Sequence, residues 1–212
     1  MYTFYMPPNT KIDFADAHQD RSKKTLEDLL EAAYSIVDAA EPKEFNSRNL
    51  ADRSGYALGT LNKRLGSVEN VFLWAIEKGR DRKIQSVIDY IEQFNPHSTI
   101  QEYAENIVDM TFEGIGIVGP RVIRFYEAKL FKRDGVTANS INFSDEFIKP
   151  HLKLVDANQT NTFRKMTQNE ASLMLRLTQH LIERPFVYDE AIAGTIEHRQ
   201  LAIDGLIRLL GK

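Results

Sequence analysis

Cysteine is absent from this 212-residue chain. The fold therefore contains no disulfide, and no thiolate is available as a nucleophile or a metal ligand. The sequence also lacks any apolar run near the roughly 20 residues that a membrane-spanning helix needs. Its first residues lack the charged and apolar regions of a secretory signal. We expect a cytoplasmic protein that does not enter a membrane.

Patterns typical of enzymes are equally scarce. The five histidines are scattered along the chain, and none stands three residues after a glutamate, the spacing that di-iron helical bundles use. No nucleophile elbow or phosphate loop occurs. We therefore expect a protein that is not an enzyme, with no catalytic residue, no metal ligand and no cofactor.

The chain is rich in helical periodicity. Hydrophobic residues make up 42% of the sequence and charged residues 27%, which is ordinary for a globular protein. No segment alternates cleanly between apolar and polar residues, so we predict an all-α fold. Thr25 and Asp28 are placed as a capping box for the first helix, and Pro42 closes it. Further helices are predicted over residues 57–65, 67–94, 99–114, 120–133, 144–157, 167–184 and 189–210.

The stretch from residue 45 to residue 71 carries the most specific pattern. Asn46 can cap a short helix, and Phe45 before it can act as a hydrophobic staple onto that helix. Gly55 supplies the positive φ of a sharp turn, after which a second helix begins near Ala57. Ala51 is small enough to let the two helices cross closely.

Leu50 and Leu61 are the apolar residues expected at that crossing. Two short helices joined by a tight glycine turn are typical of a DNA-binding helix-turn-helix. The second helix carries Lys63 and Arg64, and no acid stands in residues 54–67. Residues 21–85 hold 12 Lys and Arg against 10 Asp and Glu, although the net charge of the whole chain is -3. This local excess favours salt-sensitive DNA binding through a few cations.

Three short helices followed by a long one resemble the tetracycline-repressor (TetR) family of transcriptional regulators, over about residues 22–94. The resemblance is carried by Asn46–Ala51, Gly55, Gly59-Thr60-Leu61 and Ser67–Val71. It implies a homodimer that binds a palindromic operator on double-stranded DNA, and a small-molecule effector bound in the C-terminal half. The chain departs from the family where serine, tyrosine, phenylalanine and lysine are usual, with Ala57, Asn62, Leu65 and Val68.

The DNA contacts are expected from the second helix of the helix-turn-helix and from the start of its first helix. Asn62 can bond adenine bidentately, and Lys63 or Arg64 can bond guanine or phosphate. A solvated helix face is the alternative for these two cations, and an ordinary capping or surface role is the alternative for Thr60 and Arg48. The full set of expected DNA-contacting residues is Arg48, Ala57, Leu58, Gly59, Thr60, Asn62, Lys63 and Arg64.

The C-terminal half is rich in large apolar and aromatic residues. They can line a cavity for a small apolar or aromatic ligand, or they can simply fill a core. His151, Tyr126 and Thr111 are the polar groups that would orient such a ligand. The expected ligand-binding residues are Tyr103, Ile107, Met110, Thr111, Phe125, Tyr126, Phe147, His151 and Met174.

The last two predicted helices are apolar on more than one face. Such helices need two partners, and a two-fold copy of the same pair can cover the second face as a four-helix bundle. A thick core within one chain is the alternative. The expected dimer-interface residues are Met174, Leu181, Ile192, Ile196, Ile203, Leu206 and Leu210.

Gly114, Gly116 and Gly119 fit the GxGxxG pattern of dinucleotide-binding turns. That pattern is meaningful only between a strand and a helix, so we interpret it as a flexible helix-to-helix connection. An all-α enzyme or nucleotide-binding protein that uses these glycines stays an alternative. A helical interaction domain without DNA binding is another.

The sequence predicts four segments. Residues 1–21 form a flexible arm, 22–67 a helix-turn-helix DNA-binding domain, 68–94 a long connecting helix, and 95–212 a ligand-binding and dimerisation domain. The connecting helix is the expected route from ligand to DNA. Gly79 within it predicts either a bend or a close helix contact.

Overall fold

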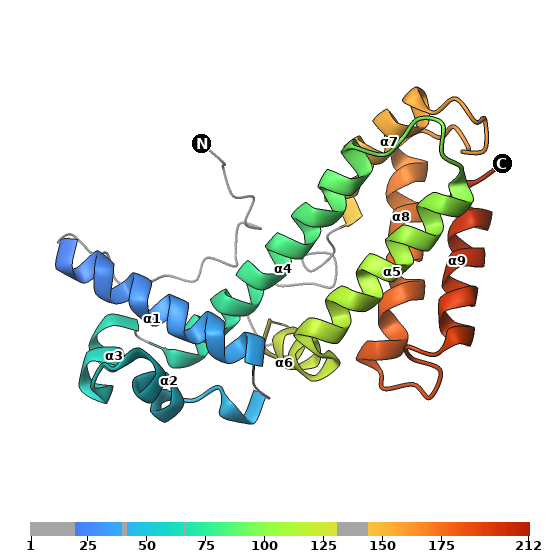
Figure 1. Cartoon of the computed structure of the whole chain (residues 1–212). Coiled ribbons are helices and arrows are strands. Elements are labelled where there is room, and N and C mark those ends of the chain that lie inside the picture. The colour runs from blue at the N-terminus through green and yellow to red at the C-terminus, as the bar shows by residue number, and fades with distance from the viewer. Residues whose placement is uncertain (1–19, 40–41, 66, 131–143) are drawn as a thin grey trace. The chain divides into compact units, whose positions relative to one another are not determined.

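The computed structural model describes residues 20–39, 42–65, 67–130 and 144–212 (Figure 1). Within these ranges, the side chains of residues 20–23, 62–65, 117–118, 130 and 144 are not described. The described residues form nine α-helices, one short 3-10 helix and no strand, which confirms the all-α prediction. An isolated bridge joins Phe163 to Gly211. None of the described helices is both long and apolar enough to cross a membrane.

The described residues form ten helical elements in sequence order. They are α1 (Asp20–Ala39), η1 (Pro42–Glu44), α2 (Ser47–Ser54), α3 (Leu58–Leu65), α4 (Val68–Glu92), α5 (Ile100–Val118), α6 (Pro120–Leu130), α7 (Ser144–Ala157), α8 (Gln168–Val187) and α9 (Ile196–Leu210).

The contacts divide the chain into two compact units. The first unit comprises Met1–Arg82 and Arg121–Ile141, and the second comprises Lys83–Pro120 and Asn142–Lys212. The helix α4 therefore contributes to both units, and α6 groups with the N-terminal helices although it follows α5 in sequence. The expected division at residues 22, 68 and 95 into functional domains stays a prediction. Residues 1–19 of the expected arm lie outside the described residues, and residues 20 and 21 already belong to α1.

The core of the first unit lies where α1, α2 and α3 pack together, and where α6 packs on α4. The Phe45 ring stacks on Phe72 of α4 at 5.0 Å between ring centroids. The same ring meets Phe125 of α6 edge-on at 5.4 Å. Phe45 thus anchors the start of α2 to α4 and α6, and its expected role as a local staple on α2 stays a prediction. Gly79 of α4 lies against Tyr34 of α1, because a Cβ at Gly79 would stand 3.6 Å from the Tyr34 ring.

Polar contacts reinforce the attachment of α6 to α4. The Tyr126 hydroxyl donates to Glu77 Oε1 at 2.7 Å and accepts from Arg80 Nη1 at 3.0 Å. Burial raises the pKa of Tyr126, so the hydroxyl keeps its proton for the bond to Glu77. Lys129 of α6 also forms an ion pair with Glu69 in the first turn of α4.

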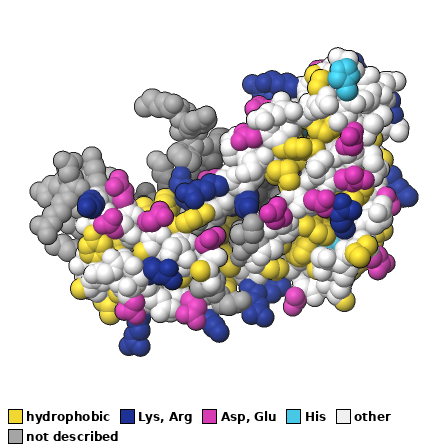
Figure 2. All heavy atoms as spheres, viewed as in Figure 1, with side chains coloured by type: hydrophobic (Ala, Val, Ile, Leu, Met, Phe, Trp, Pro, Cys, Tyr) yellow, Lys and Arg dark blue, Asp and Glu magenta, His cyan; other side chains and the backbone are white. Residues whose placement is uncertain are grey.

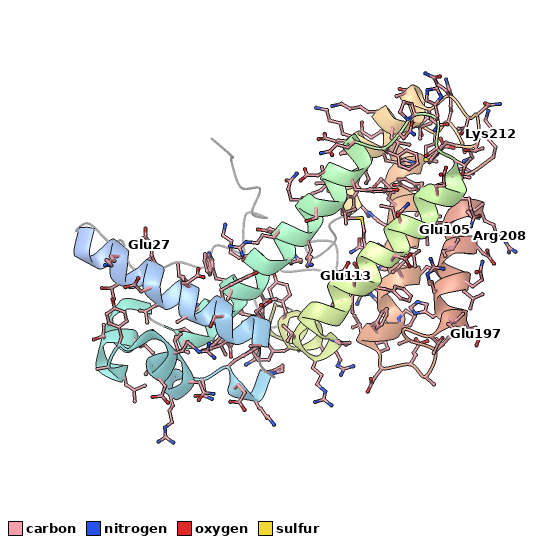
Figure 3. The ribbon with its side chains drawn as sticks, in the orientation of Figure 1. Glu27, Glu105, Glu113, Glu197, Arg208 and Lys212 are labelled. Atoms are coloured by element: carbon pink, nitrogen blue, oxygen red, sulfur yellow. The ribbon has the colours of Figure 1, made fainter. Side chains whose placement is uncertain are left out.

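In the second unit, α5, α8 and α9 pack side by side and α7 packs on α8 (Figure 1). A bidentate ion pair ties α9 to α5, with Arg199 Nε 2.6 Å from one oxygen of Asp109 and Nη2 2.8 Å from the other. Figure 3 labels Glu197 in the first turn of α9 and Arg208 in its last turn, and both charges oppose the helix dipole favourably. At Gly205, α9 approaches α8 so closely that a Cβ would stand 2.1 Å from Leu181 Cδ2.

Three helix ends differ most from the sequence prediction. The first helix begins at Asp20, so Thr25 lies inside α1, where it is buried. The capping box expected from Thr25 and Asp28 was therefore wrong, and Asp28 instead accepts a hydrogen bond from the Tyr56 hydroxyl at 2.7 Å.

Helix α5 continues through Gly114 and Gly116 to Val118, and only Gly119, at φ 82°, stands outside it as its C-cap. The motif is therefore mostly helical and not a flexible connection. The last helix was predicted to begin at residue 189, but it begins at Ile196. Asp189 and Gly194 both have a positive φ in the turns before it, at 60° and 74°.

Candidate DNA-binding and ligand-binding sites

The helix-turn-helix is built by short-range contacts that the sequence specifies. The Asn46 side chain accepts from the Asn49 amide at 3.0 Å, which confirms it as the N-cap of α2. Gly55 ends α2 at φ 74° in the left-handed region, and its amide donates to the Ala51 carbonyl. Leu50 and Leu61 are both fully buried, as expected for the residues at the crossing of α2 and α3.

Longer contacts hold this pair of helices against α1. Arg53 of α2 donates to the Ser35 hydroxyl at 3.0 Å. Tyr56, in the turn, reaches Asp28 of α1. Because both contacts come from the end of α2 and the turn after it, the position of α3 is fixed through α1 as well as through its own packing.

The start of α3 is open. Ala57, Leu58 and Gly59 are all exposed, with Leu58 exposing 48% of its surface. Ala57 has no side-chain oxygen that could cap the helix. Its carbonyl accepts from the Thr60 amide, as is usual for the residue before a helix, and no side chain of the described residues caps the first amides. A Cβ added at Gly59 would find no atom within 4 Å. Another molecule could therefore approach the backbone here without meeting a side chain.

The other expected DNA-contacting residues divide into two groups. Arg48 is exposed on α2 and Thr60 is half-buried on α3. The side chains of Asn62, Lys63 and Arg64 lie outside the described part of the chain, although their backbone is helical. On the face seen in Figure 2, the described Lys and Arg side chains are interspersed with Asp and Glu and form no single-sign field.

The structure brings together five of the nine expected ligand-binding residues. They come from α5, α7 and α8 of the second unit, and they pack in one aromatic and aliphatic cluster: Tyr103, Ile107, Phe147, His151 and Met174. Met110 and Thr111 follow on α5, where the Thr111 hydroxyl donates to the Ile107 carbonyl at 2.7 Å. Phe125 and Tyr126, the two other expected residues, lie on α6, which belongs to the first unit.

His151 is the most unusual side chain of that cluster. It is fully buried, and its Nδ1 lies 3.4 Å from the Tyr103 hydroxyl, a long contact. Its Nε2 is buried without a hydrogen-bond partner. Burial lowers the pKa of His151 to about 4, so the ring is neutral at pH 7. A buried ring nitrogen of this kind can bond a polar group of an incoming molecule.

The expected dimer-interface residues do not all reach the surface. Ile203, Leu206 and Leu210 are each 1% exposed, and they pack in the cores that α5, α8 and α9 share within one chain. This burial leaves these three residues no surface to offer a partner. Met174, Leu181 and Ile192 are half-buried. The large apolar residues that α8 and α9 expose are Leu173, Leu177, Ile196 and Leu201, and only Ile196 was predicted.

A second buried histidine was missed by sequence reasoning. His198 Nδ1 accepts from the Gly194 amide at 3.1 Å, and its Nε2 lies 3.2 Å from the Leu181 carbonyl. Pro185 has no amide hydrogen to donate to the carbonyl four residues earlier, which is that of Leu181. Histidine thus replaces the helix bond that proline removes. The pairing of a proline inside a helix with a histidine on the next one was the available signal.

No protein-family model matches this chain, and no curated protein matches it in sequence. Among solved structures, it is similar to a TetR family transcription regulator from Marinobacter aquaeolei VT8, with 17% identity, coverage of 91% of this chain and 98% of that one, and a TM-score of 0.49. It is also similar to a TetR transcriptional regulator from Rhodococcus sp. RHA1, with 16% identity, coverage of 90% and 97%, and a TM-score of 0.48.

Proposed function

We propose that this protein is a DNA-binding transcription regulator that reads a palindromic operator through α2 and α3. The observation that carries the proposal is the open start of α3, where exposed Leu58 and Gly59 stand above a turn fixed by Gly55. An exposed leucine can contact a thymine methyl group, and uncapped helix amides can bond a phosphate. Lys63 and Arg64 on the same helix would supply phosphate or guanine contacts.

Gly59 offers the sharpest test of this proposal. Gly59→Ala removes a helix glycine at a position with open space around it, so it should stabilise the fold by up to about 1 kcal/mol. Gly59→Glu adds an acid to the first turn of α3, which the helix dipole favours. In the complex with DNA, however, the same carboxylate would face the phosphates and be repelled by them.

We therefore expect Gly59→Glu to abolish binding to an operator selected from random-sequence DNA, with no loss of folding stability. Asp52→Glu, on the exposed surface of α2, is the matched control and should bind as the wild type does. Full operator binding by Gly59→Glu would rule out α3 as the reading helix.

The cations of α3 give an independent measurement. Replacing both Lys63 and Arg64 by alanine should eliminate operator binding at physiological salt. At low salt, where residual binding can be measured, each lost phosphate contact lowers the salt slope by about 1. Unchanged affinity and slope in the double variant would show that these cations do not meet DNA.

We infer that the protein acts as a dimer through the exposed apolar residues of α8 and α9. Leu173 and Leu177 are one helical turn apart on α8 and expose 54% and 46% of their surfaces, and Leu201 on α9 exposes 50%. Two-fold pairing would cover these residues and set two reading helices about 34 to 36 Å apart. Sedimentation of the wild type as a 24.3 kDa monomer at micromolar concentration would contradict this.

A small apolar or aromatic effector is proposed for the cluster around Tyr103 and His151. The unpartnered Nε2 of His151 supports this, because it offers one polar contact within an apolar surround. If such a ligand releases DNA, as a repressor requires, a coupling of about 1 to 3 kcal/mol would lower operator affinity roughly 5- to 150-fold. Operator DNA must then weaken ligand binding by the same factor. Equal ligand affinity with and without operator would exclude control by that compound.

A further inference from the structure

A groove on the second unit was not expected from the sequence. It encloses about 390 Å³ between the end of α4, the loop that follows it, and α7. Its apolar walls are formed by Ile91, Phe94, Pro96, Pro150, Leu154 and Ala157, and the charged residues that line it are Glu92 and Lys153. Ile91, Phe94 and Leu154 also pack in the core that includes Tyr103, but Tyr103 and His151 themselves do not line the groove. The volume lies within the range of small-molecule sites, about 300 to 1,000 Å³.

Hydrogen bonds fix one end of the groove. The Asn158 side chain donates to the Pro96 carbonyl at 3.1 Å and to the Ser98 carbonyl at 2.8 Å. The Gln159 amide also donates to the Pro96 carbonyl, at 2.8 Å. These bonds tie the segment after α7 to the loop after α4, so the two walls are held together before any ligand arrives. A preformed site of this kind loses little ordering entropy on binding.

The charge of Glu92 has no structural explanation. Glu92 is the last residue of α4, where the negative end of the helix dipole disfavours an acid. It is exposed, and it makes no hydrogen bond or ion pair with any residue that the structure describes. Lys153 is likewise exposed and without such a partner. Two opposite charges therefore line one groove beside its apolar residues, and neither forms a hydrogen bond or ion pair with the residues that the structure describes.

We propose that this groove binds a small zwitterion with an apolar or aromatic body, of the amino-acid type. Its ammonium group lies toward Glu92, its carboxylate toward Lys153, and its apolar body between Phe94, Leu154 and the two prolines. An anion would be attracted by Lys153 but repelled by Glu92, and a cation would meet the reverse. A neutral apolar molecule would partly desolvate both charges without pairing either one. Only a molecule that carries both charges satisfies both ends.

The test compares the binding of three probes of similar shape to the full chain. Binding is measured from changes in the amide chemical shifts in NMR spectra. L-phenylalanine carries both charges, 2-phenylethylamine only the cation, and 3-phenylpropionate only the anion. We expect phenylalanine to shift amides of the groove and to bind more tightly than either analogue. Exposed ion pairs contribute about 0.2 to 1 kcal/mol each, so each charge should be worth about 1.4- to 5-fold in affinity.

Two variants sharpen the assignment. Glu92→Gln should weaken phenylalanine and phenylethylamine but not phenylpropionate, and Lys153→Met should weaken phenylalanine and phenylpropionate but not phenylethylamine. Glu113→Gln on α5, labelled in Figure 3, and Lys149→Met on α7 remove matched exposed charges outside the groove and should change nothing. Glu92→Gln should also leave the melting temperature unchanged or raise it, because it removes an acid from the end of α4.

Equal affinity for the three probes would overturn the proposal, and so would an absence of shifts at groove residues with phenylalanine and with the longer zwitterion glycyl-phenylalanine. The proposal does not depend on the DNA-binding function. Operator binding is measured on the same samples. Failure of zwitterion binding would not affect the DNA-binding proposal, and failure of operator binding would not affect the zwitterion proposal.

Discussion

The two buried histidines of the second unit lie in opposite situations. His198, 2% exposed, has both ring nitrogens bonded, one to the Gly194 amide and one to the Leu181 carbonyl. Its ring also lies against Phe112 and Phe186, with centroids 4.8 and 5.3 Å away. His151 is more deeply buried, yet it has one long contact to Tyr103 and an unpartnered Nε2.

The difference separates a histidine that completes the hydrogen bonding of a helix from one whose ring nitrogen remains available to a ligand. His198 works in one tautomer only, with the proton on Nε2 for Leu181 and a lone pair on Nδ1 for Gly194. His151 is held mainly by packing, and its desolvation is not compensated by hydrogen bonds. Burial alone therefore does not reveal the role of a histidine. The partners of its two nitrogens do.

The largest effect should come from removing each histidine in turn. His198→Leu takes away the hydrogen-bond partner of the Gly194 amide and that of the half-buried Leu181 carbonyl, so we expect a loss of about 1 to 3 kcal/mol in unfolding free energy. His151→Leu removes an uncompensated polar group and should cost less than about 1 kcal/mol or stabilise the protein. Denaturant unfolding of both variants measures the contrast. Equal losses would break the comparison.

The second-largest effect should be a loss of unfolding free energy at acid pH, caused by protonation of His151 in the unfolded chain. Its pKa is about 4 in the folded protein, lowered by burial, against about 6.5 in an unfolded chain. Between these values the unfolded chain binds more protons, so unfolding free energy falls as pH falls from about 6.5 to 4, by roughly 3 kcal/mol in total. Tyr103 beside it stays neutral, since burial raises its pKa.

The pH dependence should be measured as the difference in unfolding free energy between the wild type and His151→Leu. Carboxylates titrate in the same pH range, and subtracting one unfolding free energy from the other cancels their contribution. As pH falls below about 6.5, the unfolding free energy of the wild type should decrease relative to that of His151→Leu. A difference that is constant from pH 7 to 4 would mean that His151 is not desolvated as described.

A smaller effect tests why His198 bonds Leu181. Pro185→Ala restores an amide that can donate to the Leu181 carbonyl within α8. In that background His198→Leu should cost about 1 kcal/mol less than in the wild type, because the half-buried Leu181 carbonyl keeps a partner within its own helix. A double-mutant cycle of unfolding free energies gives this coupling. Strict additivity would show that the carbonyl does not depend on His198.

Much of the fold could be predicted where the determinants are local. Asn46 and Gly55 act through the backbone of their own turn, so α2 and its connection to α3 follow from residue type. Thr25 and Asp28 have the spacing of a capping box, but nothing nearby in sequence excludes a helix that begins earlier. The residues before α9 keep helical spacing, and only the positive φ of Asp189 and Gly194 ends that pattern.

The candidate sites were less predictable because they depend on tertiary packing. Tyr126 and His151 both have the residue type of a polar group in an apolar pocket. Only the structure separates them, since α6 packs in the first unit with Glu77 and Arg80. Ile203 and Ile196 lie on the same predicted stripe, yet one is 1% exposed and the other 90%. The order of the helices in sequence does not reveal which neighbour covers which face.

The placement of α6 has a consequence for how the protein is made. The first unit needs residues on both sides of α5, because Phe125 and Tyr126 of α6 cover its aromatic and polar surface on α4. During synthesis, α1 to α4 leave the ribosome well before α6, at a rate of about 5 to 20 residues per second. Until α6 follows, the ring of Phe45 lacks its edge-on neighbour Phe125. A gene fragment that stops at Glu92 therefore encodes an incomplete first unit, and one that continues to Ile141 includes α6 and the rest of that unit.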